Sequence, residues 1–344
     1  MGKDAGVELN WRFEPGDEID LDEDDVRIRP NPKGSRPRTK RRPDTSDLPI
    51  GMVLQVHLAR YRVLMDSGVE VLATLAKELR SDGCVTGDRV AISGELSGTK
   101  DALARIVRIE PRATALTRSS EESEAQQTIV ANADQLVVVV AAANPDPKPR
   151  LVDRYLVAAF DQGLAPILVV TKSDLADPAS FLENFSGFDL KVITISKEQA
   201  DLSDLEAALD GHVSVFVGHS GVGKTTLINR LSPGYQRATG EVNEVTGKGK
   251  HTSSSALALR FKTGWIIDTP GIRTFGLKGV SSNSLLKGFA DIANLAQNCP
   301  RDCSHLADAP DCELDGYATS GELSALRLDS YRRLAQSLGS VEYS

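Results

Sequence analysis

Residues 218–225 read GHSGVGKT, a combination of types and spacing suited to holding phosphate. The glycines let backbone N–H groups close around phosphate oxygens, which larger side chains would block. The helix expected after the loop adds free donors and a favourable dipole. In such loops the lysine, here Lys224, reaches the β- and γ-phosphates, and the next hydroxyl, here Thr225, binds Mg²⁺. The predicted phosphate-binding residues are Gly218, His219, Ser220, Gly221, Val222, Gly223, Lys224 and Thr225.

A second motif, DTPG, begins at Asp268 at the end of the apolar run WIID. A carboxylate at this end of a strand can hold Mg²⁺ through water, and Gly271 lets the backbone approach the γ-phosphate. Ile272 follows, where Ras-type enzymes place the glutamine that orients water, so we expect slow hydrolysis by the protein alone. His251 is a candidate replacement, and an ordinary loop histidine near RNA phosphates is an equal alternative. Lys224, His251 and Gly271 are the predicted catalytic residues.

The tetrapeptide TKSD follows the apolar run APILVV. Asp174 is placed to accept hydrogen bonds from both N1–H and the exocyclic amine of guanine, and adenine lacks that pair of donors. Lys172 would pack over the base and ribose. Ser196, after the next apolar run, would supply a backbone contact to the base carbonyl. The predicted base-recognition residues are Thr171, Lys172, Ser173, Asp174 and Ser196.

The segment that must position these motifs, residues 128–277, alternates apolar strand patterns with amphipathic helix patterns. This alternation is typical of a doubly wound α/β domain with a parallel sheet. The base motif comes before the phosphate loop, and the Mg²⁺ motif comes last. The order is therefore a circular permutation of the common GTPase order, which is tolerated where chain ends lie close together.

Two different segments come before this domain. Residues 48–112 contain short strands rich in valine, leucine and isoleucine, separated by turn signals, which predict an all-β barrel like the OB-fold. Such barrels often bind oligonucleotides, and a purely structural barrel is the alternative. Residues 113–127 are predicted as a linker. Residues 1–47 hold an acidic block and a basic block, which predict a disordered tail that is compatible with a basic arm on RNA.

Three of the four cysteines crowd into residues 299–312 together with a histidine. Thiolates and imidazole are the ligands that zinc prefers, and four protein ligands close the site, so we expect one structural zinc per chain. Incidental thiols beside a surface histidine are the alternative. The site would organise a small helical domain, residues 278–344, with a terminal helix. The predicted zinc ligands are Cys299, Cys303, His305 and Cys312.

The composition of the 344 residues suits a soluble protein with several domains, with 40% hydrophobic and 26% charged residues. The formal net charge of −8 makes any surface for nucleic acid a local one. No apolar run is long enough to span a bilayer, and no secretory signal pattern is present. We expect a cytoplasmic monomer.

Together the barrel, the permuted motif order and the cysteine–histidine cluster resemble the ribosome small-subunit-dependent GTPases, the RsgA family, over residues of about 48 to 338. The resemblance implies a GTP hydrolase that assists late maturation of the small (30S) ribosomal subunit, docks on its rRNA and is stimulated by it. It also implies Thr252, in GKGKHTSSS, as a further Mg²⁺ ligand beside Thr225 and Asp268. Thr171 replaces the asparagine of many GTPases, and the metal-ligand spacing departs from the family's usual pattern.

Two other functions fit parts of the sequence. The chain is compatible with a passive RNA-binding module whose nucleotide site only stabilises the fold. It is also compatible with a metal-dependent nucleic-acid enzyme that uses zinc as its catalyst, although a closed set of four protein ligands argues against this. GTP hydrolysis measured with and without ribosomal subunits separates the three functions.

Overall fold

The computed structural model describes residues 47–81, 83–99, 102–120, 123–188, 190–197, 201–233, 256–269 and 285–339. The chain divides into residues 1–44 and a compact unit of residues 45–344, to which the description below applies. The predicted acidic and basic tail, except Asp47, lies outside the described residues. So do His251, Thr252, Gly271 and Ile272 of the predicted site.

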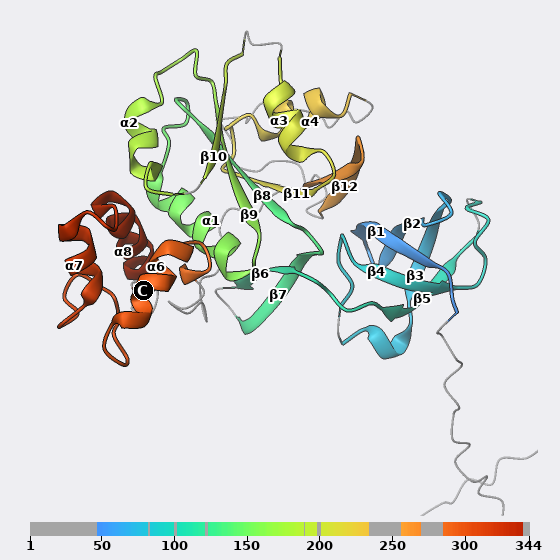
Figure 1. Ribbon diagram of the computed structural model, residues 1–344. Coiled ribbons are helices and arrows are strands. Elements are labelled where there is room, and N and C mark those ends of the chain that lie inside the picture. The colour runs from blue at the N-terminus through green and yellow to red at the C-terminus, as the bar shows by residue number, and fades with distance from the viewer. Residues whose placement is uncertain are drawn as a thin grey trace, which may run out of the picture. The chain divides into compact units, whose positions relative to one another are not determined.

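Strands β1 to β5 form the barrel predicted for residues 48–112 (Figure 1). Strand β1 pairs with β2 and also with β4, and β3 pairs with β5, so the sheet closes on itself in the order β1-β2-β3-β5-β4. This is the arrangement of an OB-fold-like barrel. Its interior is filled by alternate apolar residues such as Val53, Val63 and Ile92, all fully buried. The elements are β1 (Ile50–His57), β2 (Arg60–Met65), β3 (Glu70–Leu75), the 3₁₀ helix η2 (Lys77–Leu79), β4 (Arg89–Ser93) and β5 (Ala104–Ile109).

The segment predicted as a linker, residues 113–127, differs from the prediction. It contains β6 (Ala115–Ser120) and the first part of β7 (Ser123–Ala131), which pair as an antiparallel hairpin. Leu116 and Val130, a cross-strand pair at the base of the hairpin, are buried in the main core. The serine- and glutamate-rich tip has the composition of a linker, and these apolar residues anchor it.

The central sheet has the order β10-β9-β8-β11-β13-β12. Strands β10, β9, β8, β11 and β13 pair in parallel, whereas β12 is antiparallel both to β13 and to β1 of the barrel, which continues the sheet. Continuous apolar runs such as LVVVVA in β8 are buried on both faces, as expected for a covered parallel sheet. The strands are β8 (Gln135–Ala141), β9 (Ala165–Thr171), β10 (Lys191–Ile195), β11 (Val213–Val217), β12 (Leu257–Phe261) and β13 (Gly264–Asp268).

Helices cover the two faces of this sheet. Along β8, Leu136 and Val138 pack with α1 on one face, and Val137 and Val139 pack with α3 and α4 on the other. Helix α1 begins with Pro149, which suits the first turn of a helix because its missing N–H needs no partner there. The elements are α1 (Pro149–Asp161), α2 (Ala179–Leu182), the 3₁₀ helix η3 (Glu183–Phe185), α3 (Ser203–Leu209) and α4 (Lys224–Leu231).

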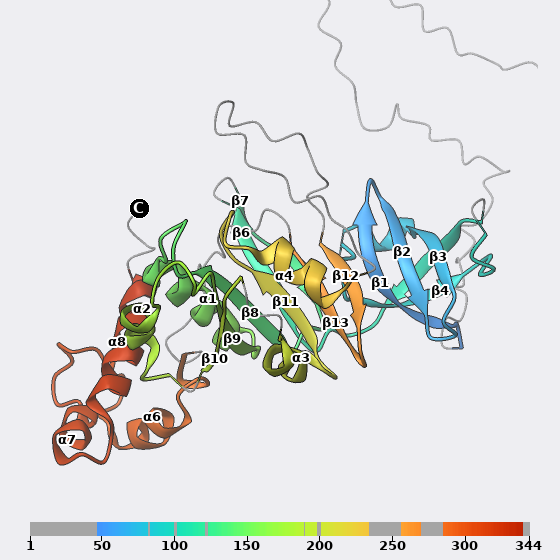
Figure 2. The ribbon, with the colours of Figure 1, turned by 90° about the horizontal axis from the view of Figure 1, so that it is seen from above.

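The C-terminal helices pack against the α1 face (Figure 2). Phe289 and Tyr331 lie at the centre of this contact, where Phe289 meets both Phe160 of α1 and Phe188 after η3. The described elements are α6 (Ala290–Leu295), the 3₁₀ helix η4 (Ala296–Asn298), α7 (Glu313–Ser320) and α8 (Ala325–Gly339). Within the described part of the chain, no helix combines the length and the apolar character needed to cross a membrane.

Candidate functional site

The predicted phosphate loop connects the end of β11 to the start of α4. Gly223 immediately precedes the helix with φ 90°, a left-handed conformation that glycine adopts without strain. A Cβ atom at Gly218 would lie 2.4 Å from the carbonyl oxygen of Val139, so only glycine fits that close approach. The loop therefore has the backbone that its sequence predicts, with the N-terminus of α4 directly after it.

The Mg²⁺ motif meets this loop because β13 is the parallel neighbour of β11. Asp268 ends β13 with 1% of its side chain exposed, and its Oδ1 lies 2.5 Å from Nζ of Lys224. Beside it, the Thr269 hydroxyl donates to the carbonyl of Phe216 across 2.7 Å. The charge pair and the threonine thus fix the end of β13 against the phosphate loop.

The base motif also contacts the phosphate loop. The Thr171 hydroxyl, at the end of β9, lies 2.6 Å from the carbonyl oxygen of Val222 and 3.1 Å from that of Val140. Nζ of Lys172 donates to the carbonyl of Gly221 across 2.9 Å and to the carbonyl of Asn144. Two successive residues of TKSD therefore hold the loop that is expected to bind phosphate.

Asp174 lies at the exposed edge of the same region and is joined to the segment after β10. Its Oδ1 accepts a hydrogen bond of 2.8 Å from the backbone N–H of Lys197. The Ser173 N–H donates to the carbonyl of Ile195, and Ser196 follows directly. The structure thus brings the two predicted base-recognition segments together at the carboxyl ends of β9 and β10.

One participant was missed by the sequence analysis. The carbonyl of Asn144, after β8, accepts from Lys172, and no side-chain motif marks a backbone acceptor. The signal that was available is an Asn-Pro pair that begins three residues after a buried strand ends at Ala141, which indicates a tight turn at the edge of the sheet where ligands bind.

The four predicted metal ligands also come together. One ligand atom from each of Cys299, Cys303, His305 and Cys312 lies within 4.8 Å of the others. Nδ1 of His305 is 4.0 Å from Sγ of Cys312, and the N–H of His305 points to Sγ of Cys303 across 3.4 Å. A Cys₃His set with this closeness suits a tetrahedral metal ion such as Zn²⁺.

Local backbone geometry and burial shape this cluster. Asp302 and His305 adopt left-handed φ values of 64° and 56°, which turn the short loop back on itself. Burial raises the pKa of Cys312 to about 11. Burial lowers the pKa of His305, and the nearby charge of Arg332 adds to this effect. A neutral imidazole is a ready ligand, and a cation is the partner that stabilises buried thiolates.

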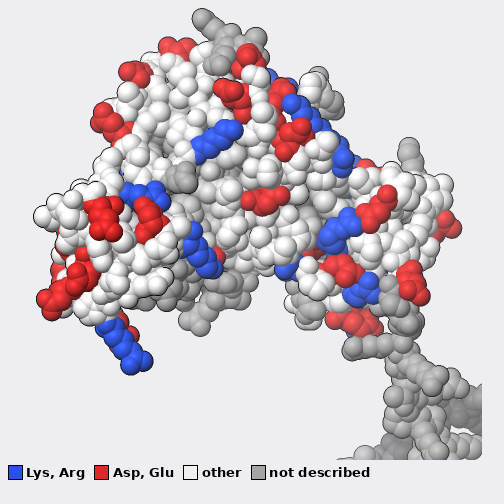
Figure 3. All heavy atoms as spheres, in the orientation of Figure 1, with Lys and Arg blue, Asp and Glu red and all other residues white. Residues whose placement is uncertain are grey.

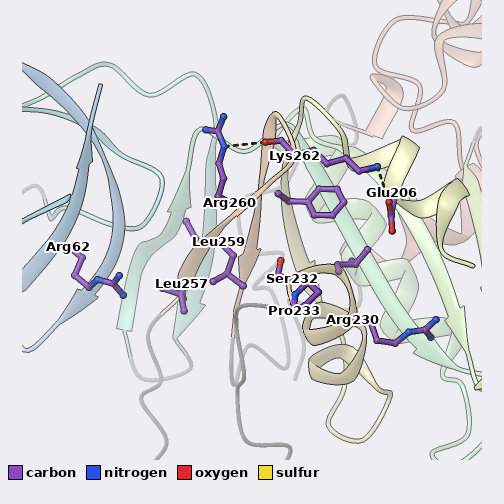
Figure 4. Close-up of a pocket in the computed structure, with 12 residues that line it drawn as sticks. Arg62, Glu206, Arg230, Ser232, Pro233, Leu257, Leu259, Arg260 and Lys262 are labelled. Carbon is purple, nitrogen blue, oxygen red and sulfur yellow. Dashed lines mark hydrogen bonds and ion pairs between the residues drawn. The ribbon is translucent and has the colours of Figure 1, made fainter. Parts of the chain in front are cut away.

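A groove of about 660 Å³ lies elsewhere, along β12 and the end of α4 (Figure 4). Its basic residues have protein partners: Nζ of Lys262 lies 2.9 Å from a carboxylate oxygen of Glu206, and the Arg260 guanidinium lies 5.1 Å from the centre of the Trp265 ring. Arg62 pairs with Glu70 at 2.7 Å. The groove is therefore distinct from the phosphate loop and offers no unpaired cluster of positive charge.

Basic and acidic side chains are interspersed on the face of the molecule shown in Figure 3. This distribution agrees with the net charge of −8, and the face has no broad area of positive charge. Any contact of this face with a polyanion would depend on small groups of basic residues.

A phosphate loop, a carboxylate at the neighbouring strand and a TKSD segment define a P-loop GTPase, and their order along the chain makes it a circularly permuted one. A family model described as RsgA GTPase matches residues 109–278, a range that includes the β6–β7 hairpin. The chain belongs to the RsgA GTPase family. It is accordingly a GTP-hydrolysing enzyme by class.

Named relatives agree with this membership. A protein of Ectopseudomonas mendocina called small ribosomal subunit biogenesis GTPase RsgA is 38% identical over 268 residues, which cover 75% of this chain and 76% of that protein. A protein of the same name from Pseudomonas syringae pv. tomato is 36% identical over 304 residues, which cover 85% and 87% of the two chains.

Solved structures show the same fold. YjeQ from Thermotoga maritima matches with a TM-score of 0.64 at 24% identity, covering 84% of this chain and 98% of that one. YloQ, described as a circularly permuted GTPase, matches with a TM-score of 0.63 at 24% identity, covering 87% and 98%. The predicted fold class, a permuted GTPase domain with a β-barrel before it, is therefore confirmed.

Proposed function

We propose that this protein hydrolyses GTP and acts in the biogenesis of the small ribosomal subunit, as the names of its relatives state for them. The observation that carries the proposal is the contact of Thr171 and Lys172 with the phosphate loop, which joins guanine recognition to phosphate binding in one site. A passive RNA-binding module would not need this arrangement, because its nucleotide would have no reaction to undergo.

Within this site we assign three roles. Asp174 selects guanine, with Lys172, Ser173 and Ser196 beside it. The backbone of Gly218 to Gly223 and the N-terminus of α4 bind the phosphates, and Lys224 stabilises the charge that develops on them. Thr225 and Asp268 hold Mg²⁺, which supplies charge neutralisation between the phosphates when bound. Thr252, Gly271 and His251 are assigned to the same site from the sequence alone.

We assign Zn²⁺ to the cluster of Cys299, Cys303, His305 and Cys312, as a structural ion. All four ligands come from the protein, which leaves no open position for a substrate and argues against a zinc-catalysed reaction. Purified protein is expected to contain close to one zinc per chain. Cys303→Ser is expected to lower that content and to make the residues beyond 290 more sensitive to protease.

The remaining parts of the chain would serve docking. We propose that the barrel of residues 48–112 and the zinc domain of residues 278–344 flank a GTPase domain of residues 128–277 and hold it on ribosomal RNA. The protein would then act in the cytoplasm as a monomer on the subunit. The basic arm in residues 1–47 would add contacts to phosphates.

The test is steady-state GTP hydrolysis with and without purified small ribosomal subunits, at saturating GTP. We expect weak activity alone and stimulation by orders of magnitude with the subunit, because a partner can complete a GTPase site. Large ribosomal subunits serve as the control. Equal rates in all three conditions would contradict the proposal, and ATP that competes with GTP equally well would overturn the assignment of Asp174.

A further inference from the structure

Arg332 of α8 reaches into the cysteine–histidine cluster from outside it. Its Nε donates to the carbonyl of His305 across 3.0 Å, and Nη2 lies 3.9 Å from Sγ of Cys312. Only 12% of the arginine side chain is exposed. One guanidinium thus contacts two of the four candidate ligand residues.

A carboxylate fixes the orientation of this guanidinium. Nη1 and Nη2 of Arg332 lie 2.7 Å and 2.9 Å from the two carboxylate oxygens of Asp315, in a two-point pair. Asp315 belongs to the first turn of α7, which begins directly after Cys312. The arginine therefore connects α8 to both ends of the loop from His305 to Cys312.

The chemistry of these contacts favours metal binding. An N–H directed at a sulfur stabilises the thiolate over the thiol, and the bond to the carbonyl of His305 holds that left-handed residue in place. Outer partners of this kind orient metal ligands, and their loss typically weakens metal affinity by about 10- to 100-fold. A lysine supplies one charge and no planar fork, so it cannot make the same set of bonds.

A second arginine on the same helix gives a matched comparison. Arg327 pairs with Asp291 and donates to the carbonyl of Gly187, so it too joins a carboxylate to a backbone oxygen. Among the interactions described for it, none involves the four candidate ligands. A difference in zinc affinity between variants of Arg332 and of Arg327 separates the effect on the metal site from the general effect of losing an ion pair on α8.

We propose that Arg332 is a positioning residue of the metal centre, which holds Cys312 and His305 in the geometry that zinc requires. The proposal rests on the assignment of zinc to this cluster. It adds an outer partner that no motif in the sequence marks, since Arg332 lies 20 positions beyond Cys312.

The experiment measures zinc affinity by competition with a chromophoric chelator for the full chain and for Arg332→Met, Arg332→Lys and Arg327→Met. We expect about 10- to 100-fold weaker binding for Arg332→Met. A smaller loss is expected for Arg332→Lys, and affinity close to that of the unsubstituted protein for Arg327→Met. Cobalt-loaded Arg332→Met is expected to show a shifted sulfur-to-metal charge-transfer band. Equal affinity of Arg332→Met and the unsubstituted protein would overturn the proposal.

Asp315→Asn provides a second variant if Arg332→Met fails to fold. It retains the arginine and removes its charged anchor, so we expect zinc binding weaker than that of the unsubstituted protein, by up to about 10-fold. Unchanged affinity would count against the proposal. Failure of the unsubstituted protein to bind zinc would remove the metal centre itself, whereas its GTP hydrolysis, measured in the same preparation, tests the GTPase assignment separately.

Discussion

The TKSD segment is joined to the phosphate loop through the hydroxyl of Thr171 at the end of β9. The hydroxyl of Thr171, rather than the amide of an asparagine, lies 2.6 Å from the carbonyl of Val222 in the phosphate loop. The hydroxyl of threonine lies closer to the backbone than the side-chain amide of asparagine does. Thr171 is buried at the end of β9, and this position brings its hydroxyl within hydrogen-bond distance of the Val222 carbonyl. The substitution relative to many GTPases thus retains a link between the two motifs.

Thr171→Val tests that link with little change in side-chain shape. The variant leaves a buried carbonyl without its donor, which costs about 1–2 kcal/mol and corresponds to GDP binding that is about 5- to 30-fold weaker. Thr171→Ser keeps the hydroxyl and is the matched control, with near-normal affinity. Calorimetric titration with GDP measures both. Equal affinities for the valine variant and the unsubstituted protein would contradict the role of the hydroxyl.

Asp174→Asn tests base selection. In the proposed site the carboxylate accepts from two guanine donors, and an amide cannot, so we expect GTP binding to weaken by about 2–4 kcal/mol. The new N–H group can donate to the 2-carbonyl of xanthine, so binding of xanthosine triphosphate is expected to improve. Titrations with both nucleotides and with ATP measure the change. Unaltered preference for GTP in the variant would show that another residue reads the base.

The motif residues could be predicted from the sequence because their chemistry depends on residue type and on spacing along the chain. The eight residues from Gly218 to Thr225 occupy a strand-to-helix turn, as their pattern predicts. Contacts made by backbone atoms were not accessible: the acceptors for Lys172 come from Gly221 and Asn144, which lie 49 and 28 positions away. Such pairs depend on the tertiary fold, so no local sequence pattern predicts them.

Among the elements, α8 connects the C-terminal domain to the GTPase domain through Arg333. Nη2 of Arg333 lies 3.1 Å from Oδ1 of Asp153 in α1 and donates to the carbonyl of Asn184 in η3 across 2.7 Å. The guanidinium also lies 5.6 Å from the centre of the Phe185 ring. Because η3 lies between β9 and β10 along the chain, the helix that carries Arg332 also contacts the segment that joins these two strands.

Arg333→Met tests this contact. Asp153 has 4% of its side chain exposed, and losing the partner of such a buried carboxylate costs about 2–4 kcal/mol of unfolding free energy. Urea unfolding measures the loss. Arg333→Met combined with Asp153→Asn is the control, and it is expected to recover part of the stability because no buried charge remains unpaired.

The same variant predicts a pH dependence. Burial raises the pKa of Asp153, against the lowering effect of Arg333, so removing the arginine raises it further. Since the folded-state pKa lies above the unfolded value, ionisation destabilises the fold, and protonation relieves this as pH falls through the folded-state pKa. The loss in Arg333→Met is therefore expected to be smaller at pH 5 than at pH 8. An equal loss at both pH values would contradict this origin.

Element types were largely predictable from apolar periodicity, and the β6–β7 hairpin shows where that reasoning fails. Its tip is polar and serine-rich, and the burial of Leu116 and Val130 comes from packing on the core of the central sheet. A pattern with few apolar positions has no strand signal until the neighbouring surface is known. The packing of α8 on α1 could not be predicted from the sequence for a similar reason, since Arg333 and Asp153 lie 180 positions apart.

At the scale of the whole molecule, the permuted motif order determines which domain follows the last nucleotide motif along the chain. The last strand of the central sheet along the chain, β13, ends at Asp268, and the chain then passes to the C-terminal segment that carries the cluster of Cys299, Cys303, His305 and Cys312. In the common GTPase order that motif is followed by the rest of the GTPase domain. The segment expected to respond to the γ-phosphate is therefore followed directly along the chain by the domain proposed to dock on RNA.

This connection predicts that the GTP-bound protein binds small ribosomal subunits more tightly than the GDP-bound protein. Cosedimentation with a non-hydrolysable GTP analogue and with GDP measures the difference, which we expect to reach about tenfold or more.

Lys224→Ala is expected to abolish hydrolysis. Cys303→Ser is expected to keep the GTP affinity of the isolated protein and to lose most of the stimulation by the subunit, because it loosens the domain proposed to dock on RNA and leaves the nucleotide site intact. Subunit binding that is the same in both nucleotide states, or full stimulation of Cys303→Ser, would show that docking and the nucleotide site act independently.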